Sequence, residues 1–194
     1  MTPRGCAILH VPHRNQQLIC TSLPTSWGYR NPKARADILP SEYFVQLFQK
    51  VSTIDNTPYL CVPKALEFRE KVCGGEDAIR RYSEKIAEDG GKRVAELLGT
   101  EVLPTSRTCC FTNVRLPLRS SEIVTLNDQG VQVAQWMEDT TGREYHTYIP
   151  VHFYKGEFWC RLSGQIYLTI EDFEWAAGML GELCDRVKAG DWTR

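Results

Sequence analysis

The sequence predicts an α+β fold, and three patterns along the chain support that prediction. Apolar residues recur three and four positions apart between residues 76 and 98, which is the spacing of one helix face. Residues 108–118 and 146–163 instead alternate apolar and polar side chains, as strands do. The segment 105–194 is long enough to form a small domain with its own core.

The first third of the chain offers little to build a core. Residues 4–11 are typical of a strand that ends at Pro12, and residues 21–41 carry prolines and glycine among polar residues, which predicts a long loop. One strand and a loop cannot bury a core without neighbours. We therefore expect residues 1–55 to be part of something larger.

Two helices are predicted next. The first begins at Thr57 and ends at residues 73–75, where two glycines follow a cysteine. The second begins near Glu76 and closes at Gly99. Gly90-Gly91 lies inside the second helix, and because glycine weakens helices we expect a kink there.

The remaining pattern predicts strands paired with helices. A strand is expected at residues 108–118 and a helix at 127–138. A hairpin follows, with strands at 146–154 and 158–163 joined by a tight turn at 155–157.

The last predicted helix has both a start signal and an apolar face. Thr169 and Asp172 have the spacing of a capping box. The apolar residues of this helix that share one face are Phe173, Ala176, Leu180, Leu183 and Val187.

Composition narrows the class of protein. The 194 residues are 42% hydrophobic and 24% charged, with a formal net charge of -1, which is ordinary for a soluble globular protein. The chain lacks the excess of basic residues that is typical of nucleic-acid-binding proteins. It also has no apolar stretch long enough to span a membrane. The N-terminus lacks the apolar core of a signal peptide, so a cytoplasmic protein is expected.

The cysteines are scattered and form no C-x-x-C pair. Their spacing therefore favours reduced thiols over a disulfide framework or a zinc site. The eight positions are Cys6, Cys20, Cys61, Cys73, Cys109, Cys110, Cys160 and Cys184.

An ordered set of short motifs spans nearly the whole chain. The set resembles the class V aminotransferase family, in its isopenicillin-N epimerase-like branch, which includes the hercynylcysteine sulfoxide lyases. One motif alone would be weak evidence, but the order is specific. The motifs are Thr2-Pro3-Arg4-Gly5-Cys6-Ala7, Val11-Pro12-His13-Arg14-Asn15-Gln16, Leu23-Pro24-Thr25-Ser26-Trp27-Gly28-Tyr29, Thr53-Ile54-Asp55-Asn56-Thr57-Pro58-Tyr59-Leu60, Ala65-Leu66-Glu67-Phe68-Arg69, Cys73-Gly74-Gly75-Glu76, Asn113-Val114-Arg115-Leu116-Pro117 and Arg161-Leu162-Ser163-Gly164-Gln165-Ile166-Tyr167.

The resemblance implies the C-terminal small domain of a fold-type I transferase that depends on pyridoxal 5'-phosphate (PLP). Residues 1–75 would be a remnant of the PLP-binding α/β large domain. Residues 76–104 would be a long connecting helix, and residues 105–194 the small α+β domain. In the family the Schiff-base lysine lies just before the Thr-Pro-Arg-Gly motif. Because the chain starts at Met1, we expect that lysine to be absent and the chain to be inactive alone.

The resemblance also assigns a substrate-binding role to Arg161. The family places an arginine for the substrate carboxylate in an Arg-x-Ser motif at this point. A guanidinium presents a planar fork that matches a carboxylate. Arg161 alternates with Cys160 and Leu162, so it is expected to face away from them. The alternative is a surface arginine held in a salt bridge.

Three further segments have candidate roles. The resemblance implies that Thr53, with Ser52 beside it, binds the PLP phosphate across a dimer; the alternative is that both cap the following helix. It also implies that Trp27 and Tyr29 line the substrate pocket; the alternative is that they pack within their loop or form a dimer contact. His146 and His152 share a strand face, but no third ligand is evident and no metal site is predicted.

The expected function is that of a PLP-dependent transferase, C–S lyase or epimerase acting on an amino-acid-like small molecule, in secondary metabolism. The alternative is a non-catalytic fragment, or a partner subunit of an intact paralogue. A homodimer, or pairing with a complementing PLP-domain chain, is expected because relatives share active sites across a dimer.

Overall fold

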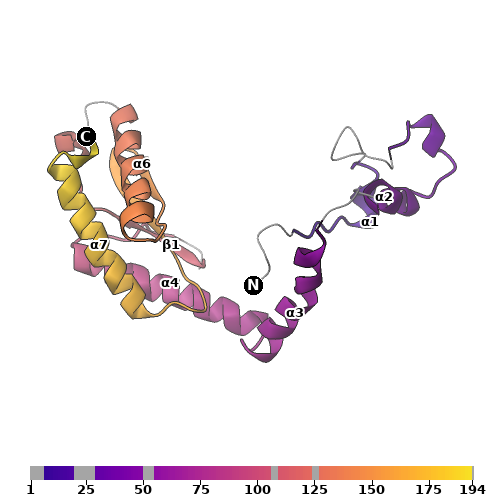
Figure 1. Ribbon diagram of the computed structural model, residues 1–194, viewed down its shortest axis with the longest axis horizontal. Helices are drawn as coiled ribbons and strands as arrows, with labels where there is room; N and C mark the ends of the chain where they lie inside the picture. The colour runs from indigo at the N-terminus through magenta and orange to yellow at the C-terminus, as the bar shows by residue number, and fades with distance from the viewer. Residues whose placement is uncertain (1–6, 20–28, 50–54, 106–108, 124–126, 194) are drawn as a thin grey trace. The chain divides into compact units, whose positions relative to one another are not determined.

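The computed structural model describes residues 7–19, 29–49, 55–105, 109–123 and 127–193 (Figure 1). The chain divides into two compact units, Met1–Phe68 and Arg69–Arg194. The assignment of such units to a PLP-binding domain and a small domain stays a prediction.

The first unit contains short helices. They are α1 (His13–Gln16), the 3-10 helix η1 (Lys33–Arg35), α2 (Pro40–Gln49) and most of α3 (Thr57–Lys71). On α2, Tyr43 and Leu47 are buried one turn apart. The Arg30 backbone N–H donates to the Tyr43 hydroxyl, and the Arg35 guanidinium lies 5.0 Å from the Tyr43 ring centroid. These contacts explain why α2 forms inside a segment whose start was predicted to be loop.

The predicted strand at residues 4–11 is wrong for its described part. Residues 7–11 have no regular structure and residues 7–10 are exposed. A strand needs a neighbouring strand for its backbone hydrogen bonds. None is present among the described residues of Met1–Phe68.

The two predicted central helices are confirmed as α3 and α4 (Glu76–Leu98). Gly74 and Gly75 separate them with φ angles of 78° and 85°, which suit glycine. Gly99 ends α4 in the left-handed conformation, and its N–H reaches the Glu96 carbonyl.

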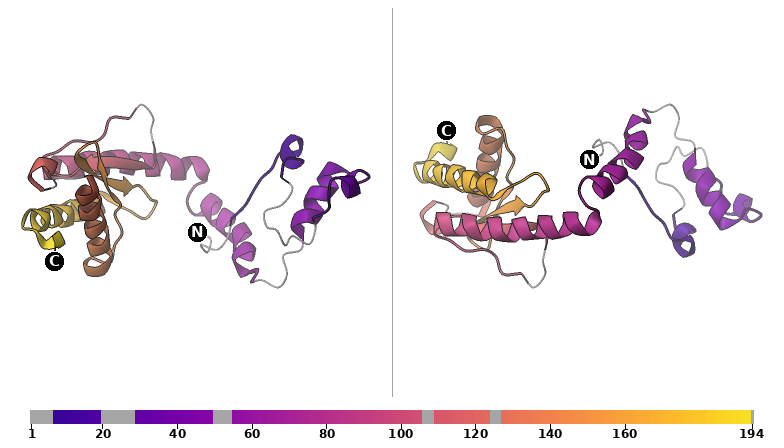
Figure 2. Two further views of the ribbon diagram at one scale, coloured as in Figure 1. Left: turned by 90° about the horizontal axis from the view of Figure 1, so that it is seen from above. Right: turned by 90° about the horizontal axis from the view of Figure 1, so that it is seen from below.

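The expected kink at Gly90-Gly91 is wrong, because α4 passes through both residues without interruption (Figure 2). Both glycines are buried at points of close packing. A Cβ on Gly90 would lie 2.4 Å from the Phe173 ring, and one on Gly91 would lie 2.4 Å from the Thr112 side chain. The glycines thus let α4 approach α7 and β1 closely.

The second unit contains a three-stranded antiparallel sheet in the order β1-β3-β2. The strands are β1 (Phe111–Arg115), β2 (Val151–Tyr154) and β3 (Glu157–Ser163). The predicted hairpin is confirmed, with Lys155 and Gly156 in its turn at φ angles of 51° and 81°. In the centre of the sheet, buried Cys160 pairs with Val114 on one side and Val151 on the other.

Two strands are shorter than predicted. Cys109 and Cys110 precede β1 rather than belonging to it. His146 has a φ of 53° and follows the end of α6, so β2 begins only at Val151. A positive φ is incompatible with an extended strand.

Three helices, α4, α6 and α7, surround this sheet and build the core with it (Figure 1). Helix α4 packs against α7, β1 and β3, and α6 (Asn127–Glu144) packs against β2. The capping box at Thr169 is confirmed and starts α7 (Ile170–Lys188). The predicted apolar face of α7 is buried: Phe173, Ala176, Leu180, Leu183 and Val187.

Helix α6 continues to Glu144, beyond its predicted end at Glu138. Thr140 and Thr141 are buried, and their hydroxyls donate to the Trp136 and Glu138 carbonyls. The Glu138 carboxylate accepts the Val151 backbone N–H at 2.7 Å. The helix therefore continues past the end of its apolar pattern, with both threonine hydroxyls satisfied by carbonyls of the preceding turn.

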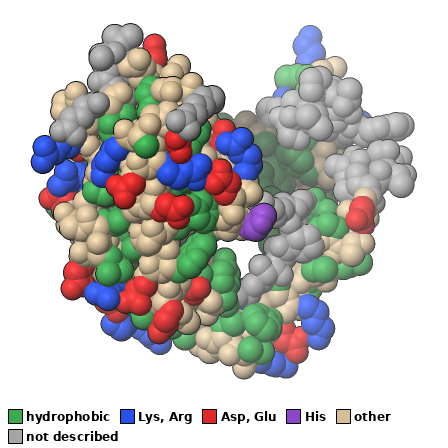
Figure 3. All heavy atoms as spheres, turned by 60° about the vertical axis from the view of Figure 1, so that its left-hand side comes forward, with side chains coloured by type: hydrophobic (Ala, Val, Ile, Leu, Met, Phe, Trp, Pro, Cys, Tyr) green, Lys and Arg blue, Asp and Glu red, His purple; other side chains and the backbone are tan. Residues whose placement is uncertain are grey.

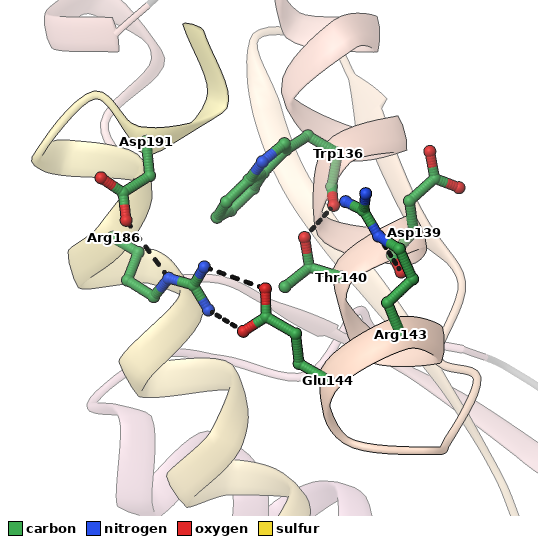
Figure 4. Close-up of polar contacts among 7 residues, drawn as sticks. All are labelled: Trp136, Asp139, Thr140, Arg143, Glu144, Arg186 and Asp191. Carbon is green, nitrogen blue, oxygen red and sulfur yellow. Dashed lines mark hydrogen bonds and ion pairs between the residues drawn. The ribbon is translucent and has the colours of Figure 1, made fainter. Parts of the chain in front are cut away.

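Arg186 links α7 to the end of α6 and to the C-terminal residues of the unit (Figure 4). Arg186 on α7 donates two hydrogen bonds to Glu144 of α6, at 2.7 and 3.2 Å. It also pairs with Asp191 of the 3-10 helix η2 (Asp191–Thr193) and lies 5.2 Å from the Trp136 ring centroid. The short helix α5 (Ser120–Ile123) completes the described elements.

The surface mixes charges of both signs. On the face drawn in Figure 3, basic and acidic side chains lie interspersed rather than in a field of one sign. Among the described helices, none is both long enough and apolar enough to cross a bilayer.

Candidate functional site

Arg161 lies on the outer face of the sheet. Its neighbours in β3, Cys160 and Leu162, are buried on the opposite face, whereas Arg161 is exposed. The prediction that Arg161 faces away from them is therefore confirmed. Its cross-strand partner is Asn113, and Ser163 pairs with Phe111 in the same register, so these four residues share one face.

The guanidinium of Arg161 rests on an aromatic ring. It lies 5.6 Å from the centroid of Phe111. A cation over a ring face is held electrostatically, and the ring limits where the side chain can go. The Arg161 backbone N–H donates to the Pro150 carbonyl at 2.9 Å, which continues the sheet on the β2 side. Backbone and side chain are thus both positioned.

Arg115, the arginine on β1, differs from Arg161 because it pairs with carboxylates. Arg115 lies 3.1 Å from a Glu101 carboxylate oxygen and 3.7 Å from one of Glu157. No carboxylate of the described residues lies within ion-pairing distance of Arg161. The alternative of a salt-bridged surface arginine therefore has no acidic partner in the described part of the chain.

Gly164 lets the end of β3, the strand that carries Arg161, lie close to α4. Its N–H donates to the Cys110 carbonyl at 2.7 Å. A Cβ on Gly164 would lie 2.1 Å from the carbonyl oxygen of Ser83, a buried residue of α4. Just beyond, the Tyr82 hydroxyl donates to the Leu168 carbonyl at 2.7 Å. The segment after Arg161 is therefore fixed at both ends to one helix.

A groove of about 320 Å³ lies beside the Phe111 ring. One wall consists of α4 residues and the others of residues 102–105 and the start of β1. Lys92 in this groove pairs with Glu88. Its lining residues are Glu84, Glu88, Lys92, Val102, Leu103, Pro104, Thr105, Cys109, Phe111 and Thr112. Phe111 thus borders both the groove and Arg161.

The remaining predicted site residues belong to the first unit, and their roles stay predictions. Trp27, Ser52 and Thr53 lie outside the described residues. Tyr29 is 51% exposed and belongs to the first unit, whereas Arg161 belongs to the second.

The histidines and thiols carry no metal cluster in the described residues. His146 and His152 are both exposed. No group of three or more His, Cys, Asp or Glu side chains comes together there. The six described cysteines have free thiols, and burial raises the pKa of Cys160 and of Cys184 to about 12.

Sequence reasoning missed Phe111 and Gly164 as parts of the site. A signal for Phe111 existed, because positions 111 and 113 share a strand face with Arg161 once β1 and β3 are paired. The role of Gly164 depends on a contact with α4 that is distant in sequence, so no local pattern reveals it.

Comparison with known proteins gives a consistent set of relatives. The L-cysteine desulfhydrase-like protein lolT2 of Epichloe uncinata is 35% identical over 95% of the chain, and lolT1 of the same organism is 34% identical over 95%. The hercynylcysteine sulfoxide lyase of Schizosaccharomyces pombe is 31% identical over 94%. No protein-family model matches the chain.

The chain spans about half the length of the curated relatives it matches, namely 47%, 48% and 43% of them. The similarity nevertheless extends along nearly the whole chain. The chain is thus related to cysteine desulfhydrase-like and sulfoxide lyase proteins, which confirms its resemblance to the isopenicillin-N epimerase-like, hercynylcysteine sulfoxide lyase-like branch of the class V aminotransferases.

Proposed function

We propose that the chain is part of a PLP-dependent enzyme that breaks a carbon–sulfur bond in an amino-acid substrate. The names of the relatives support this reaction type. Removal of sulfide from cysteine and cleavage of a cysteine-derived sulfoxide both break such a bond. Within the proposed enzyme this chain supplies the group that binds the substrate's α-carboxylate.

The observation that carries the proposal is that the Arg161 side chain is exposed and unpaired with any carboxylate of the described residues. Its guanidinium is exposed, lies over Phe111 and has no carboxylate partner among the described residues. A fork of this kind takes a carboxylate through two parallel hydrogen bonds. A hydrogen bond to a charged group is worth about 1.5–3 kcal/mol, so loss of Arg161 should weaken carboxylate binding by roughly ten- to a hundredfold.

PLP would supply the electron sink for such chemistry when it is bound. The described residues fit the substrate side of such a site better than the cofactor side. Every lysine among them is exposed, and Lys92 in the groove already pairs with Glu88. The phosphate-binding candidates Ser52 and Thr53 lie outside the described residues. The chain's own proposed role is therefore to bind and orient the substrate.

The surface of the first unit supports a second proposal, that residues 1–68 are covered by further polypeptide. Large apolar side chains there are mostly in water: Ile8 is 76% exposed, Leu60 75% and Leu18 74%. An apolar surface that is contiguous typically marks an interaction site. A second copy of the chain or a complementing PLP-domain chain would cover them. If the chain alone does not react with PLP, these exposed side chains favour the hypothesis that the chain is a partner subunit.

The carboxylate role is tested by titrating the chain with L-cysteine and with cysteamine, which lacks the carboxylate. The Arg161 Nε–H resonance should move with L-cysteine and not with cysteamine. Arg161→Gln should weaken L-cysteine binding by roughly ten- to a hundredfold, whereas Arg143→Gln, at an exposed position of α6, should leave it unchanged. An equal response to cysteamine, or unchanged binding by Arg161→Gln, would overturn the role.

The cofactor role is tested separately by adding PLP and reducing with borohydride. We expect no single lysine of the isolated chain to be labelled in preference to the other exposed lysines. Stoichiometric labelling of one mapped lysine would contradict a purely substrate-binding role and assign the cofactor to this chain.

A further inference from the structure

Two adjacent cysteines, Cys109 and Cys110, lie immediately before β1. Cys109 is exposed, Cys110 is half-buried, and both thiols are free. The chain bends at Cys110, and the ladder with β3 starts only at Phe111.

Small molecules can reach the exposed member of this pair, Cys109. Cys109 lines the groove of about 320 Å³ together with Lys92 and the carboxylates of Glu84 and Glu88.

The other described thiols differ from this pair. Cys160 and Cys184 are buried, and burial disfavours their thiolates. Cys61 and Cys73 are half-buried, and neither has an adjacent cysteine in the sequence. Among the described cysteines, only Cys109 is exposed, and it has a second thiol at the next position of the chain.

A backbone hydrogen bond also connects the pair to β3, the strand that carries Arg161. The Cys110 carbonyl accepts the N–H of Gly164, three residues beyond Arg161. A covalent change at the pair would therefore act on the end of β3. This connection holds whether or not Arg161 has the proposed substrate role.

We propose that Cys109 and Cys110 form a redox-active vicinal dithiol that exchanges with low-molecular-mass disulfides. The Cys109 thiolate attacks one sulfur of the disulfide RSSR, which forms a mixed disulfide and releases one thiolate. The Cys110 thiolate then attacks the Cys109 sulfur and displaces the second thiolate. The two protons lost by the cysteines end on the two RSH products, so RSSR is reduced and the pair is oxidised.

Glutathione disulfide is the probe for this exchange, applied to the full chain. Free thiols are then blocked with iodoacetamide under denaturing conditions. Trypsin cleaves after Arg107 and Arg115, so both cysteines appear in the peptide 108–115 with no other cysteine. We expect this peptide to lack alkyl groups and to be lighter than the dithiol by two hydrogen atoms. A doubly alkylated peptide, or glutathione retained on Cys109, would overturn the proposal.

Matched variants separate the pair from single thiols. Cys109→Ser and Cys110→Ser should each lose the oxidised form, whereas Cys73→Ser should keep it. Phenylarsine oxide, which needs two thiols, should bind the chain more tightly than either variant by on the order of tenfold or more. Equal arsenical affinity in Cys109→Ser and the unmodified chain would contradict the proposal even if oxidation is slow.

Discussion

Gly164 approaches Ser83 so closely that any side chain at position 164 would collide with the backbone of α4. An ideal Cβ would lie 2.1 Å from the Ser83 carbonyl oxygen and 2.9 Å from the Ile86 side chain. The colliding oxygen is backbone and cannot rotate away. The end of β3, which carries Arg161, is therefore positioned by the absence of a side chain.

Gly164→Ala should destabilise the chain and disturb Arg161. Forcing extra atoms into a packed site typically costs about 1–3 kcal/mol. The measurement is the free energy of unfolding in urea, together with the Arg161 Nε–H resonance. Gly178→Ala is the control, because Gly178 is exposed on α7 and a Cβ there meets nothing within 4 Å. Alanine at that helix position should stabilise by up to about 1 kcal/mol. Equal effects of the two substitutions would contradict the packing argument.

Gly90→Ala should also destabilise, although alanine favours helices. The added Cβ would lie 2.4 Å from the Phe173 ring, so α4 and α7 would have to separate. We expect a loss of about 1–3 kcal/mol in the free energy of unfolding. Phe173→Leu should reduce the additional cost of Gly90→Ala, which a double-mutant cycle measures. An additive cycle would show that the glycine does not act through this contact.

The elements with strong local patterns could be predicted from the sequence. The capping box at Thr169, the left-handed end at Gly99 and the turn at Gly156 all depend on neighbours within a few residues. The outward direction of Arg161 followed from strand alternation in the same way.

The errors arose where distant contacts decide the structure. The glycines at positions 90 and 91 indicated a weak helix, whereas Phe173 and Thr112 make them packing positions. Residues 7–11 have the composition of a strand but no strand partner in the described part of their unit. Helix α2 forms although Pro40 was assigned to a loop, because Tyr43 and Leu47 become buried. Burial and pairing of this kind cannot be read from one segment alone.

Glu144 should make stability depend on pH at the C-terminal end of the second unit. The hydrogen bonds from Arg186 lower the pKa of Glu144 below its usual value. The ionised pair therefore stabilises the fold above the unfolded-state pKa, and this contribution is lost as pH falls through the lower folded-state pKa. Melting temperatures of the chain and of Glu144→Gln should differ at neutral pH and converge in acid, below a usual glutamate pKa of about 4.3.

The Arg186→Gln background is the control for this effect. There, Glu144→Gln should leave the pH dependence of the melting temperature unchanged, because the carboxylate has lost its hydrogen-bond donor. A persisting difference would assign the pKa shift to another group.

Cys160 and Cys184 should resist alkylation until the second unit unfolds. Both thiols are buried, and burial raises the pKa of each to about 12. At pH 8 the reactive thiolate would be only roughly one part in ten thousand, and the reagent would also lack access. Iodoacetamide labelling of the native chain should therefore modify exposed Cys109 before the other described cysteines.

The labelling rates of Cys160 and Cys184 should rise together with urea and follow the unfolded fraction. Cys160 lies in the centre of the sheet and Cys184 on α7, so a shared rate would show that strand and helix open as one unit. Faster labelling of Cys184 alone would instead show that α7 detaches before the sheet opens. Leu183→Ala, which leaves a cavity beside Cys184 on the buried face of α7, should accelerate both rates if opening is cooperative.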